Sequence, residues 1–468
     1  MLQTDTRLNA ITDRLRDICG PSFVVTDPFA LQPYEQDETM NLRYPFDVLV
    51  TPGSVAEISA IMKVCQQERI PVTPRGGGSG VTGGALPVNG GVVLLMARLN
   101  SLVELNTVDG YVIAEAGMIT KELCNIVEAA GLFFPVTPTS YASSMLGGNV
   151  AENAGSIYSC RYGTTADYVL NLEVVLPDGD IIWTSANVSK NATGIPLTGL
   201  FVGSEGILGI ITKVVYRLLP LPAYSAVLLA AFDDLETACN AVKAIRQSGL
   251  SPAAGELICE NAIRLTAAHM SEQLPLVKPA VKAHLLLEWK ETSEALLDNA
   301  LELVSDILEG FTREELLLGT TASEKDRLWQ LRRNIGHAMT SQQFYYRDVD
   351  VCIPPSKLFE YIVQVEQICG RHHLRTVCFG HAMNGNLHTM ILMERQADDG
   401  QELAVGKALN EIYGFAIQLG GVISGEHGIG LLQKAYMPLQ FPAVHMQLFR
   451  KLKALFDPHN ILNPGKVI

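Results

Sequence analysis

Arg75-Gly-Gly-Gly-Ser-Gly-Val-Thr-Gly-Gly84 is the stretch that decides the fold of the first half of this chain. Its segment Gly78–Gly83 matches the pattern Gly-x-Gly-x-x-Gly, but in a Rossmann fold that loop must open a helix whose N-terminus holds a pyrophosphate. Here Pro87 and Asn89-Gly-Gly91 follow, and a helix would not carry them in its first turns. The consecutive backbone N–H groups instead predict an anion-binding nest for a pyrophosphate, with a flexible linker as the alternative.

A second stretch rich in small residues lies at 143–156. It contains Gly147-Gly-Asn149 and Asn153-Ala-Gly155. Such residues allow a close approach of the backbone, and their amide side chains can hydrogen-bond along the ribose and ring edge of a dinucleotide. Tight packing between two elements is the alternative reading, and both can hold together.

A third motif, Cys378-Phe-Gly-His-Ala-Met-Asn-Gly-Asn-Leu-His388, predicts a hairpin that carries two imidazoles. Asn384-Gly385 is a strong signal for a two-residue turn, which would place His381 directly opposite His388. Directly opposed residues have Cβ atoms about 4.5–5.5 Å apart, so both rings can reach one ion. A pair of surface hairpin histidines is the alternative.

The glycine-flanked segment Ser424-Gly-Glu-His-Gly-Ile-Gly430 adds a carboxylate and a third imidazole. Two histidines and one glutamate make a divalent-metal site that keeps open positions for a substrate. This arrangement is typical of a catalytic rather than a structural metal.

The composition limits the classes of protein that remain. At 468 residues, two or three domains are expected, and 48% hydrophobic with 18% charged residues describes a globular enzyme. A net charge of −14 argues against nucleic acid as a partner. The nine cysteines include no Cys-x-x-Cys pair, which disfavours zinc ribbons, iron–sulfur clusters and disulfides and favours a cytoplasmic setting. Because the N-terminal residues show no basic region followed by an apolar one, we expect no secretory signal, and the apolar runs are only as long as strands.

Local patterns divide the chain near Leu219-Pro-Leu-Pro222. Before this hinge, residues 54–68 predict an amphipathic helix with Ser54 as N-cap and Glu57 completing a capping box. Beyond it, strands and helices alternate, with strands at 225–232 and 284–289 and helices between and after them. This alternation predicts a second domain of α/β type.

The motifs occur in one order along nearly the whole chain, and together they resemble the FAD-binding oxidoreductases of the vanillyl-alcohol oxidase superfamily. The D-lactate, D-2-hydroxyglutarate and glycolate dehydrogenase branch is the most similar. The resemblance implies an α+β fold, with a two-subdomain FAD-binding domain and an α/β substrate (cap) domain whose sheet is mainly antiparallel. The expected boundaries are an N-terminal helix and arm at 1–45, the FAD-binding domain at 46–220, the cap at 221–425, and a C-terminal segment at 426–468 that packs back on the FAD domain. The matching motifs are Pro74–Gly80, Gly147–Gly155, Tyr162-Gly163 with Asp167-Tyr-Val169, Gly203–Gly206, Gly380-His381 with Gly385–His388, Ser424–Gly430 and Asn463-Pro-Gly465.

The same resemblance assigns cofactor contacts. The first loop would hold the FAD pyrophosphate, the second would line adenine, ribose and flavin, and the last motif would reach the edge of the isoalloxazine. Some members of the superfamily tether FAD through a histidine in the first loop, and because this loop has none we predict non-covalent FAD. The residues assigned to FAD are Arg75, Gly76, Gly77, Gly78, Ser79, Gly80, Thr82, Gly83, Pro138, Thr139, Gly147, Gly148, Asn149, Asn153, Gly155, Ile210 and Asn463.

In this branch the two hairpin histidines and the loop glutamate bind one divalent metal, usually zinc, which implies His381, His388 and Glu426 here. His427 would be the base that removes the hydroxyl proton, and the C2 hydrogen would leave as hydride to the flavin. A structural hydrogen bond is the alternative role for His427.

Substrate recognition departs from the D-2-hydroxyglutarate pattern. Arg332 matches the arginine that grips a carboxylate, which suits a planar guanidinium, although it could also be a helix-surface residue. The other three polar positions of the pattern fall on Gly336, on or near Asp348 (where Arg347 could compensate), and on Met390. We therefore expect a small or apolar D-2-hydroxy acid, D-lactate first and D-2-hydroxyglutarate next.

The sequence is also compatible with other functions. The chain could be the flavin subunit of a glycolate dehydrogenase complex, a sugar-lactone or alcohol oxidase on the same fold, or a non-catalytic flavin or metal-binding protein. Because no second cofactor motif occurs, electrons would leave to an external acceptor such as a quinone, a cytochrome or an electron-transfer flavoprotein. The expected location is the cytoplasm, with peripheral contact to the inner membrane open, and a homodimer would be unsurprising.

Overall fold

The computed structural model describes residues 2–270, 274–312, 314–341, 345–393 and 399–468. Contacts between Cα atoms divide the chain into two compact units. The first unit contains residues 1–156, 164–220 and 426–468, and the second contains residues 157–163 and 221–425. The short segment 157–163 therefore belongs to the second unit, although the chain on both sides of it belongs to the first.

The first unit begins with a small sheet whose strand order is β1 (Val24–Val25), β2 (Val48–Val50), β4 (Val92–Leu95) and β3 (Val72–Arg75). In this sheet β2 and β3 run parallel to β4, and helix α3 (Val55–Glu68) connects β2 to β3. Ser54 caps α3 as predicted, because its Oγ accepts a hydrogen bond from the backbone N–H of Glu57 at 3.2 Å. The carboxylate of Glu57 accepts from the N–H of Gly53 at 2.8 Å, so the returning bond reaches one residue further than a capping box.

The first unit also contains an antiparallel sheet whose strand order is β5 (Leu102–Asn106), β6 (Tyr111–Glu115), β10 (Ile210–Arg217), β8 (Val169–Val175) and β9 (Ile181–Trp183). The small-residue stretch predicted to bind a dinucleotide forms a short helix, α5 (Leu146–Glu152), which contacts β10. Gly147 lies against Ala116, the residue that follows β6, since a Cβ on Gly147 would be 2.7 Å from the Cβ of Ala116. The close packing considered from the sequence is therefore present at this glycine.

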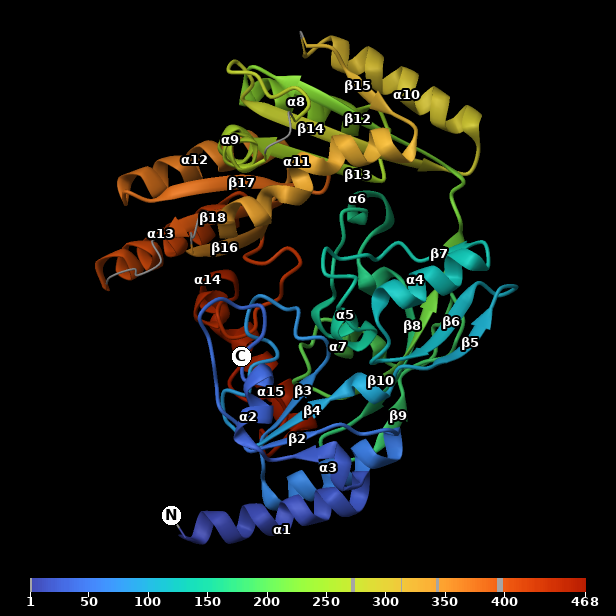
Figure 1. Cartoon of the computed structure of the whole chain (residues 1–468), viewed down its shortest axis with the longest axis vertical. Helices are drawn as coiled ribbons and strands as arrows, with labels where there is room; N and C mark the ends of the chain where they lie inside the picture. Colours follow the sequence, from blue (N-terminus) through green and yellow to red (C-terminus); the bar gives the residue numbers. More distant parts are fainter. Residues whose placement is uncertain (1, 271–273, 313, 342–344, 394–398) are drawn as a thin grey trace. The chain divides into compact units, whose positions relative to one another are not determined.

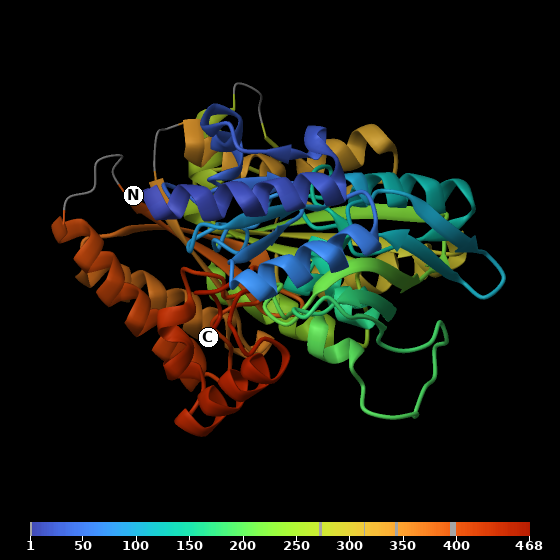
Figure 2. The ribbon, with the colours of Figure 1, turned by 90° about the horizontal axis from the view of Figure 1, so that it is seen from below.

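The C-terminal segment returns to the first unit through helix α15 and the tail that follows it. Backbone bonds from Val72 N to Ile461 O and from Asn463 N to Val72 O attach the tail beside β3. Figure 2 shows the C-terminal helices in red, and α1 in dark blue lying next to α3, with which it is in contact. The elements of the first unit are α1 (Leu2–Cys19), β1 (Val24–Val25), α2 (Pro28–Leu31), β2 (Val48–Val50), α3 (Val55–Glu68), β3 (Val72–Arg75), β4 (Val92–Leu95), β5 (Leu102–Asn106), β6 (Tyr111–Glu115), α4 (Thr120–Ala129), β7 (Leu132–Phe133), α5 (Leu146–Glu152), β8 (Val169–Val175), β9 (Ile181–Trp183), α7 (Thr198–Phe201), β10 (Ile210–Arg217), β11 (Leu219–Pro220), α14 (Met437–Gln440) and α15 (Ala443–Phe456).

The second unit is built on a seven-stranded sheet of order β15-β12-β14-β13-β17-β18-β16, in which every neighbouring pair is antiparallel (Figure 1). This agrees with the predicted antiparallel cap. Its elements are α6 (Ser159–Tyr162), β12 (Tyr224–Phe232), α8 (Leu235–Gln247), β13 (Ala254–Cys259), α9 (Glu260–His269), β14 (Ala283–Glu291), α10 (Glu294–Glu309), β15 (Leu317–Gly319), α11 (Ala322–Ser341), β16 (Tyr345–Cys352), α12 (Leu358–Arg371), β17 (Arg375–His381), β18 (Asn386–Met393) and α13 (Asp399–Gln418).

Helices α9 and α11 pack on one face of this sheet. Their apolar side chains form a buried cluster with alternate residues of β17 and β18, among them Phe379 and Met390. Because side chains alternate between the faces of a strand, His381 and His388 belong to the same face as Phe379 and Met390. Helix α12 contacts β17 on the opposite face, where Tyr361 lies near Cys378 and Thr389. The predicted metal histidines thus point toward the side of the sheet on which α11 lies.

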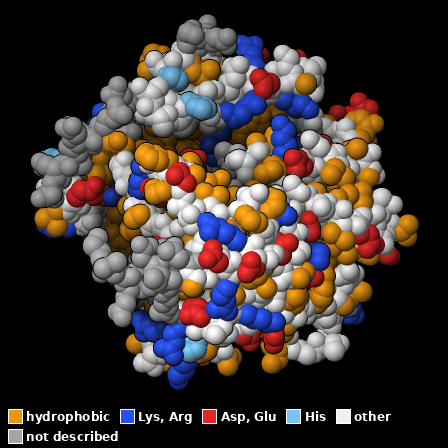
Figure 3. Space-filling model, turned by 60° about the horizontal axis from the view of Figure 1, so that its bottom comes forward, with side chains coloured by type: hydrophobic (Ala, Val, Ile, Leu, Met, Phe, Trp, Pro, Cys, Tyr) orange, Lys and Arg blue, Asp and Glu red, His pale blue; other side chains and the backbone are white. Residues whose placement is uncertain are grey.

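Charged side chains of both signs lie on the surface, and the cysteines form no disulfides. On the face shown in Figure 3, acidic and basic side chains are interspersed. All nine cysteines are free thiols. Among the described residues, no helix combines the length and the apolar character needed to cross a bilayer.

Candidate active site

The glycine-rich loop leaves a row of backbone donors without protein acceptors. Within the described residues, none of the N–H groups of residues 76–83 donates a hydrogen bond to the protein. The loop is nevertheless held in shape, because Gly78 has a φ of +69° and its carbonyl accepts from the N–H of Glu38 at 3.2 Å. A fixed loop with unpaired N–H groups is the arrangement that binds a phosphate or pyrophosphate.

Arg75 supports this loop with its side chain. Its guanidinium donates to the backbone carbonyls of Tyr34 at 3.3 Å, Gln36 at 2.8 Å and Ala85 at 3.5 Å. Burial lowers the pKa of Arg75, and the nearby Asp37 opposes that effect. The structure therefore shows Arg75 joining the N-terminal arm to the loop, whereas the sequence predicted a contact with the cofactor.

The amide side chains of the second stretch also have protein partners. Asn149 Nδ2 donates to Thr120 Oγ1 at 2.8 Å, and Asn153, which has a φ of +52°, accepts from the N–H of Ala166 through Oδ1 at 2.9 Å. Gly148 is different, because a Cβ on it would meet no atom within 4 Å. Of the other predicted contacts, Pro138 and Thr139 lie in the loop before α5, Gly155 is buried after α5, and Ile210 begins β10.

Asn463 joins the tail to two of the glycine motifs. Its Nδ2 donates to the carbonyls of Gly84 at 3.2 Å and Glu205 at 2.8 Å, and its Oδ1 accepts from Lys466 Nζ at 2.6 Å. Lys466 also donates to the carbonyl of Gly84 at 2.9 Å, and burial lowers its pKa to about 7. The observed hydrogen bonds of Asn463 hold the tail against the loop. Its predicted contact with the isoalloxazine edge stays a prediction.

The loop that carries Glu426 and His427 is fixed within the first unit. The carboxylate of Glu205 accepts the N–H groups of Ile429 and Gly430, both at 2.7 Å. Thr82 Oγ1 donates to the backbone carbonyl of His427 at 3.1 Å. His427 Nε2 lies 4.0 Å from Glu426 Oε1, so the predicted base and the predicted metal ligand are neighbours.

The hairpin of the second unit differs in register from the prediction. The turn is a four-residue loop, Ala382–Gly385, in which Gly385 has a φ of +86° and Asn384 does not have a positive φ. His381 pairs with Asn386, and His388 pairs with Phe379. The predicted two-residue turn with His381 opposite His388 is therefore wrong.

The two histidines still come together because the register error is an even number of residues. A shift of two keeps every side chain on its face of the sheet, so His381 and His388 become diagonal neighbours. Their ring centroids are 5.4 Å apart, and both residues are buried. The loop requires glycine at position 385, since a Cβ on Gly385 would lie 1.8 Å from the carbonyl oxygen of Ile353.

Glu256 on β13 lies directly opposite His381 and is completely buried. Its Oε1 is hydrogen-bonded to His381 Nδ1, and its Oε2 accepts from Arg332 Nε at 2.6 Å. Burial alone raises the pKa of Glu256, but the charges and hydrogen bonds of His381 and Arg332 outweigh it and lower the pKa to about 2. A carboxylate that is charged in the core thus connects a predicted metal ligand to the predicted substrate arginine.

Asp350 on β16 has the equivalent position beside His388. It pairs directly with His388, and its Oδ1 lies 3.7 Å from His388 Nδ1. The same carboxylate accepts from Asn386 Nδ2 at 2.7 Å, from Ser424 Oγ at 3.1 Å and from the N–H of Gly425 at 2.9 Å. It therefore connects the second histidine to the segment that immediately precedes Glu426.

Neither Glu256 nor Asp350 was identified from the sequence. A signal existed for each, since Glu256 stands in the apolar strand Ala254–Cys259 and Asp350 stands between valines in Val349–Val351. Acidic residues are rarely fully buried without a partner, so a carboxylate inside an apolar strand points to one. The partner itself depends on strand order, which the sequence does not give.

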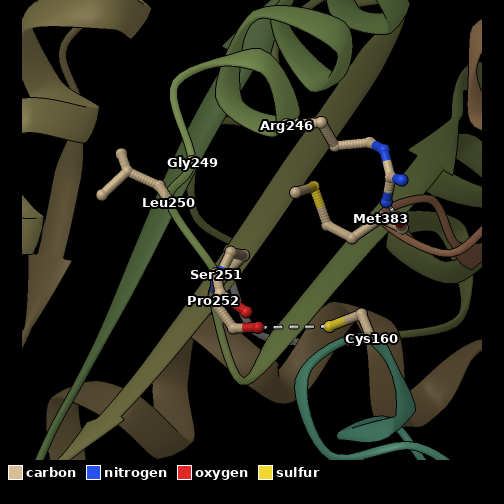
Figure 4. Close-up of a pocket in the computed structure, with 7 residues that line it drawn as sticks. All are labelled: Cys160, Arg246, Gly249, Leu250, Ser251, Pro252 and Met383. Atoms are coloured by element: carbon tan, nitrogen blue, oxygen red, sulfur yellow. Dashed lines mark hydrogen bonds between the residues drawn. The ribbon is translucent and has the colours of Figure 1, made fainter.

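A separate pocket of about 150 Å³ in the second unit holds no metal ligand set (Figure 4). Its lining contains no histidine or carboxylate, and burial raises the pKa of its one thiol, Cys160, to about 12. Arg246 donates to the backbone carbonyl of Met383, which supports the hairpin loop from outside. The lining residues are Cys160, Arg246, Gly249, Leu250, Ser251, Pro252 and Met383.

Comparison with protein families identifies both parts of the chain. A model described as "FAD binding domain" matches residues 46–185, and one described as "FAD linked oxidases, C-terminal domain" matches residues 221–467. The chain belongs to the FAD-linked oxidases. FAD is the cofactor of this family, and the nest of unpaired N–H groups in the first unit fits its pyrophosphate.

This FAD-linked oxidase is similar to curated relatives over nearly its whole length. It is 33% identical over 457 residues to the "Glycolate oxidase subunit GlcD" of Bacillus subtilis, covering 98% of this chain and 96% of the relative. It is 35% identical over 439 residues to the "D-lactate dehydrogenase" of Archaeoglobus fulgidus, covering 93% and 95%. The chain is therefore an FAD-dependent oxidoreductase.

Comparison with solved structures bears on the fold alone. p-Cresol methylhydroxylase superposes on this FAD-linked oxidase with a TM-score of 0.80 at 19% identity, covering 98% of this chain and 96% of the other. The predicted fold class, α+β with an FAD-binding domain of the vanillyl-alcohol oxidase type, is confirmed.

Proposed function

We propose that this FAD-linked oxidase is a metal-assisted dehydrogenase that oxidises a D-2-hydroxy acid, with D-lactate favoured and D-2-hydroxyglutarate next, to the 2-oxo acid. One observation carries the proposal: Glu256 is bonded to His381 through one oxygen and to Arg332 through the other. A metal ligand and a carboxylate-binding group are thereby held by one buried side chain. A 2-hydroxy acid presents a hydroxyl and a carboxylate on adjacent carbons, which is the spacing such a pair would serve.

The glycine loop and its surroundings would hold FAD without a covalent bond. The unpaired N–H groups of residues 76–83 support contact with the pyrophosphate, and the open space at Gly80 and Gly148 supports a cofactor passing close to the backbone. The absence of histidine from residues 75–84 removes the usual side chain for a covalent tether in that loop.

His381, His388 and Glu426 would hold one divalent ion, with zinc as the expected metal. His381 directs Nδ1 to Glu256, so Nε2 is the nitrogen that can bind a metal. Glu426 follows Gly425, whose N–H is bonded to the carboxylate beside His388. Consecutive Cα atoms are only about 3.8 Å apart, so chain connectivity keeps Glu426 next to that network. Two imidazoles and a carboxylate suit zinc, manganese and iron.

Arg332 would bind the substrate carboxylate. Its Nε is used by Glu256, and among the described residues its two terminal nitrogens have no hydrogen-bond acceptor. Its guanidinium lies over the ring of Phe379, with the central carbon 4.6 Å from the ring centroid. Met390 belongs to the apolar cluster around Phe379, which supports a small or apolar group at C3 of the substrate rather than a second carboxylate.

In the proposed reaction, the bound cofactor and metal ion supply one part of the chemistry and the side chains of the protein supply the other. When bound, FAD supplies a two-electron acceptor and a divalent ion supplies a Lewis acid. His427 would take the hydroxyl proton, because a neutral imidazole is a competent base near pH 7. Arg332 would fix the carboxylate, and with it the face of C2 that is presented to the flavin.

The alternative within the same chemistry is the flavin subunit of a glycolate dehydrogenase complex. The 98% coverage by a relative named as a glycolate oxidase subunit favours it. In either case an external acceptor such as a quinone, a cytochrome or an electron-transfer flavoprotein would take the electrons. We propose a cytoplasmic location, with the inner-membrane surface as the place of contact when the acceptor is a quinone.

Anaerobic reduction of the purified yellow protein tests the proposal. The flavin absorbance near its visible maximum is followed after mixing with D-lactate, L-lactate, D-2-hydroxyglutarate and glycolate. Rapid bleaching by D-lactate and slow or no bleaching by L-lactate is the expected result. Bleaching by none of these acids, while dithionite still reduces the flavin, would contradict the proposal and favour a lactone or alcohol oxidase.

The metal is tested in the same assay with His388→Ala. This variant should retain flavin, lose most of the bound metal measured by elemental analysis, and lose reduction by D-lactate. Wild-type reduction rates in a metal-free His388→Ala protein would remove the Lewis acid from the mechanism.

A further inference from the structure

Two buried carboxylates flank the histidine hairpin in the sheet. The strand order β13-β17-β18-β16 places one strand on each side of the hairpin, and each supplies a single acidic residue directly opposite one histidine. Glu256 faces His381 and Asp350 faces His388, and both carboxylates have no exposed surface. Directly opposed side chains on one face are the closest neighbours in an antiparallel sheet, so this arrangement is fixed by register.

Burying a charged carboxylate in the protein interior costs free energy unless the carboxylate gains polar partners. Moving a carboxylate out of water costs several kcal/mol even after relaxation. Hydrogen bonds with His381 and Arg332 offset this desolvation cost for Glu256. For Asp350 the cost is offset by hydrogen bonds from Asn386, Ser424 and Gly425. Apolar residues of similar size would have filled both positions at less cost, which points to a functional reason for the charges.

Resting on the proposed function, we propose that Glu256 and Asp350 are positioning residues for the metal site. Each orients one imidazole with Nδ1 toward a carboxylate and Nε2 toward the ion. Each also connects its histidine to another part of the site, Glu256 to the substrate arginine Arg332 and Asp350 to the backbone that leads into Glu426. A carboxylate behind a metal-bound imidazole fixes the tautomer and strengthens the ligand, and removing such a partner usually lowers metal affinity about 10–100-fold.

Besides orienting a histidine, each carboxylate would hold a different part of the site, and substitutions can distinguish the two roles. Replacing Glu256 removes the partner of Arg332 as well as that of His381, so it should affect both metal binding and substrate binding. Replacing Asp350 releases Ser424 and Gly425, and should affect metal binding without acting on Arg332. Merely structural roles would predict the same general loss of stability for both.

The test measures metal affinity by chelator competition in the flavin-containing full-length protein, using Zn²⁺ and Co²⁺ as probes. Glu256→Gln and Asp350→Asn should each weaken metal binding about 10–100-fold while flavin content stays near one per chain. Glu256→Gln should also raise KM for D-lactate at saturating metal, and Asp350→Asn should change KM much less. The visible spectrum of the Co²⁺ protein should shift in both variants.

Glu288→Gln is the matched control. Glu288 is a buried carboxylate on β14 of the same sheet, and it accepts from Trp329 Nε1 at 3.1 Å rather than from a histidine. Its replacement should leave metal affinity and the Co²⁺ spectrum unchanged. If Glu256→Gln does not fold, Glu256→Asp keeps the charge and shortens the reach, and it should show the same direction of change.

The outcomes separate this proposal from the function on which it rests. Wild-type metal affinity in both folded variants would overturn the positioning role, even where His388→Ala loses the ion. Equal loss of affinity in Glu288→Gln would also overturn it, because the effect would then be one of general stability. A wild-type protein that reduces its flavin with D-lactate but binds no divalent ion would instead overturn the metal part of the proposed function.

Discussion

Glycine is present at different positions of the first loop for different physical reasons. At Gly77 the protein leaves no room, because a Cβ would lie 2.2 Å from the carbonyl oxygen of Ser143. At Gly80 a Cβ would meet no protein atom within 4 Å, and the residue does not have a positive φ. Gly77 is thus required by the fold itself, whereas the protein leaves room for a side chain at Gly80, and we propose that contact with the cofactor is the reason for a glycine there.

Alanine at these two positions should separate folding from flavin binding. Gly77→Ala forces backbone apart and should lower the free energy of unfolding of the apoprotein by about 1–3 kcal/mol. Gly80→Ala should leave the apoprotein within about 0.5 kcal/mol of wild type but weaken FAD binding about tenfold or more. Denaturant unfolding of the apoproteins and titration with FAD measure the two effects. Unchanged FAD affinity in Gly80→Ala would count against contact between that residue and the cofactor.

At the scale of elements, the large sheet of the second unit brings the site residues together. Glu256, His381, His388 and Asp350 come from four neighbouring strands, and each pairing is set by the antiparallel register. The same face of β14 carries His284, which lies opposite Ile258 of the apolar cluster. Its Nε2 is bonded to the carbonyl of Leu276 at 3.1 Å, and its Nδ1 has no partner among the described residues.

His284 should make the second unit sensitive to acid. Burial lowers its pKa from 6.5 to about 4, and the bond to Leu276 opposes this only in part. Between these pH values the unfolded chain binds a proton at His284 that the folded chain does not bind. The contribution of neutral His284 to the free energy of unfolding is therefore complete above pH 6.5 and falls as the pH drops toward 4. The whole effect is about 3 kcal/mol, of which about 2 kcal/mol is lost by pH 5.

The measurement compares His284→Gln with wild type by denaturant unfolding at pH 7.5 and pH 5. Glutamine can still donate to the carbonyl of Leu276, so the variant should lose about 2 kcal/mol less than wild type on acidification. The exposed His445→Gln serves as control and should follow wild type. Parallel losses in His284→Gln and wild type would mean that other groups cause the acid sensitivity.

At the scale of the whole molecule, the first unit depends on contacts between distant parts of the chain. The chain leaves this unit at residue 220 and returns at residue 426. Lys453 closes the unit by donating to the carbonyls of Ile207 at 2.8 Å and Leu462 at 2.7 Å, and to the carboxylate of Asp457. Asp457 in turn accepts the N–H groups of Ile461 and Leu462, which fixes the tail that ends at Asn463.

Removing the ammonium group should therefore loosen the tail. Lys453→Met leaves Asp457 buried without its cation, a change that usually costs about 3–5 kcal/mol. The variant should unfold at lower denaturant concentration and release FAD more readily, measured by tryptophan and flavin fluorescence. Lys451→Met, which changes an exposed lysine of the same helix, is the control and should behave as wild type. A stable Lys453→Met protein with an undocked tail would show that the tail is dispensable for folding.

The sequence by itself determined the features that depend on neighbouring residues. Consecutive glycines in one loop predict a phosphate-binding backbone, strands that alternate with helices predict an α/β cap domain, and Ser54 predicts the start of α3. These predictions follow from local sterics, hydrogen bonding and hydrophobic periodicity. The faces of His381 and His388 were also predictable, because side-chain alternation survives an even shift in register. Only the tertiary structure decided which groups stand behind those histidines. Glu256 and Asp350 are far from them in sequence and adjacent only through strand order, and strand order is set by the packing of the whole sheet rather than by any local pattern.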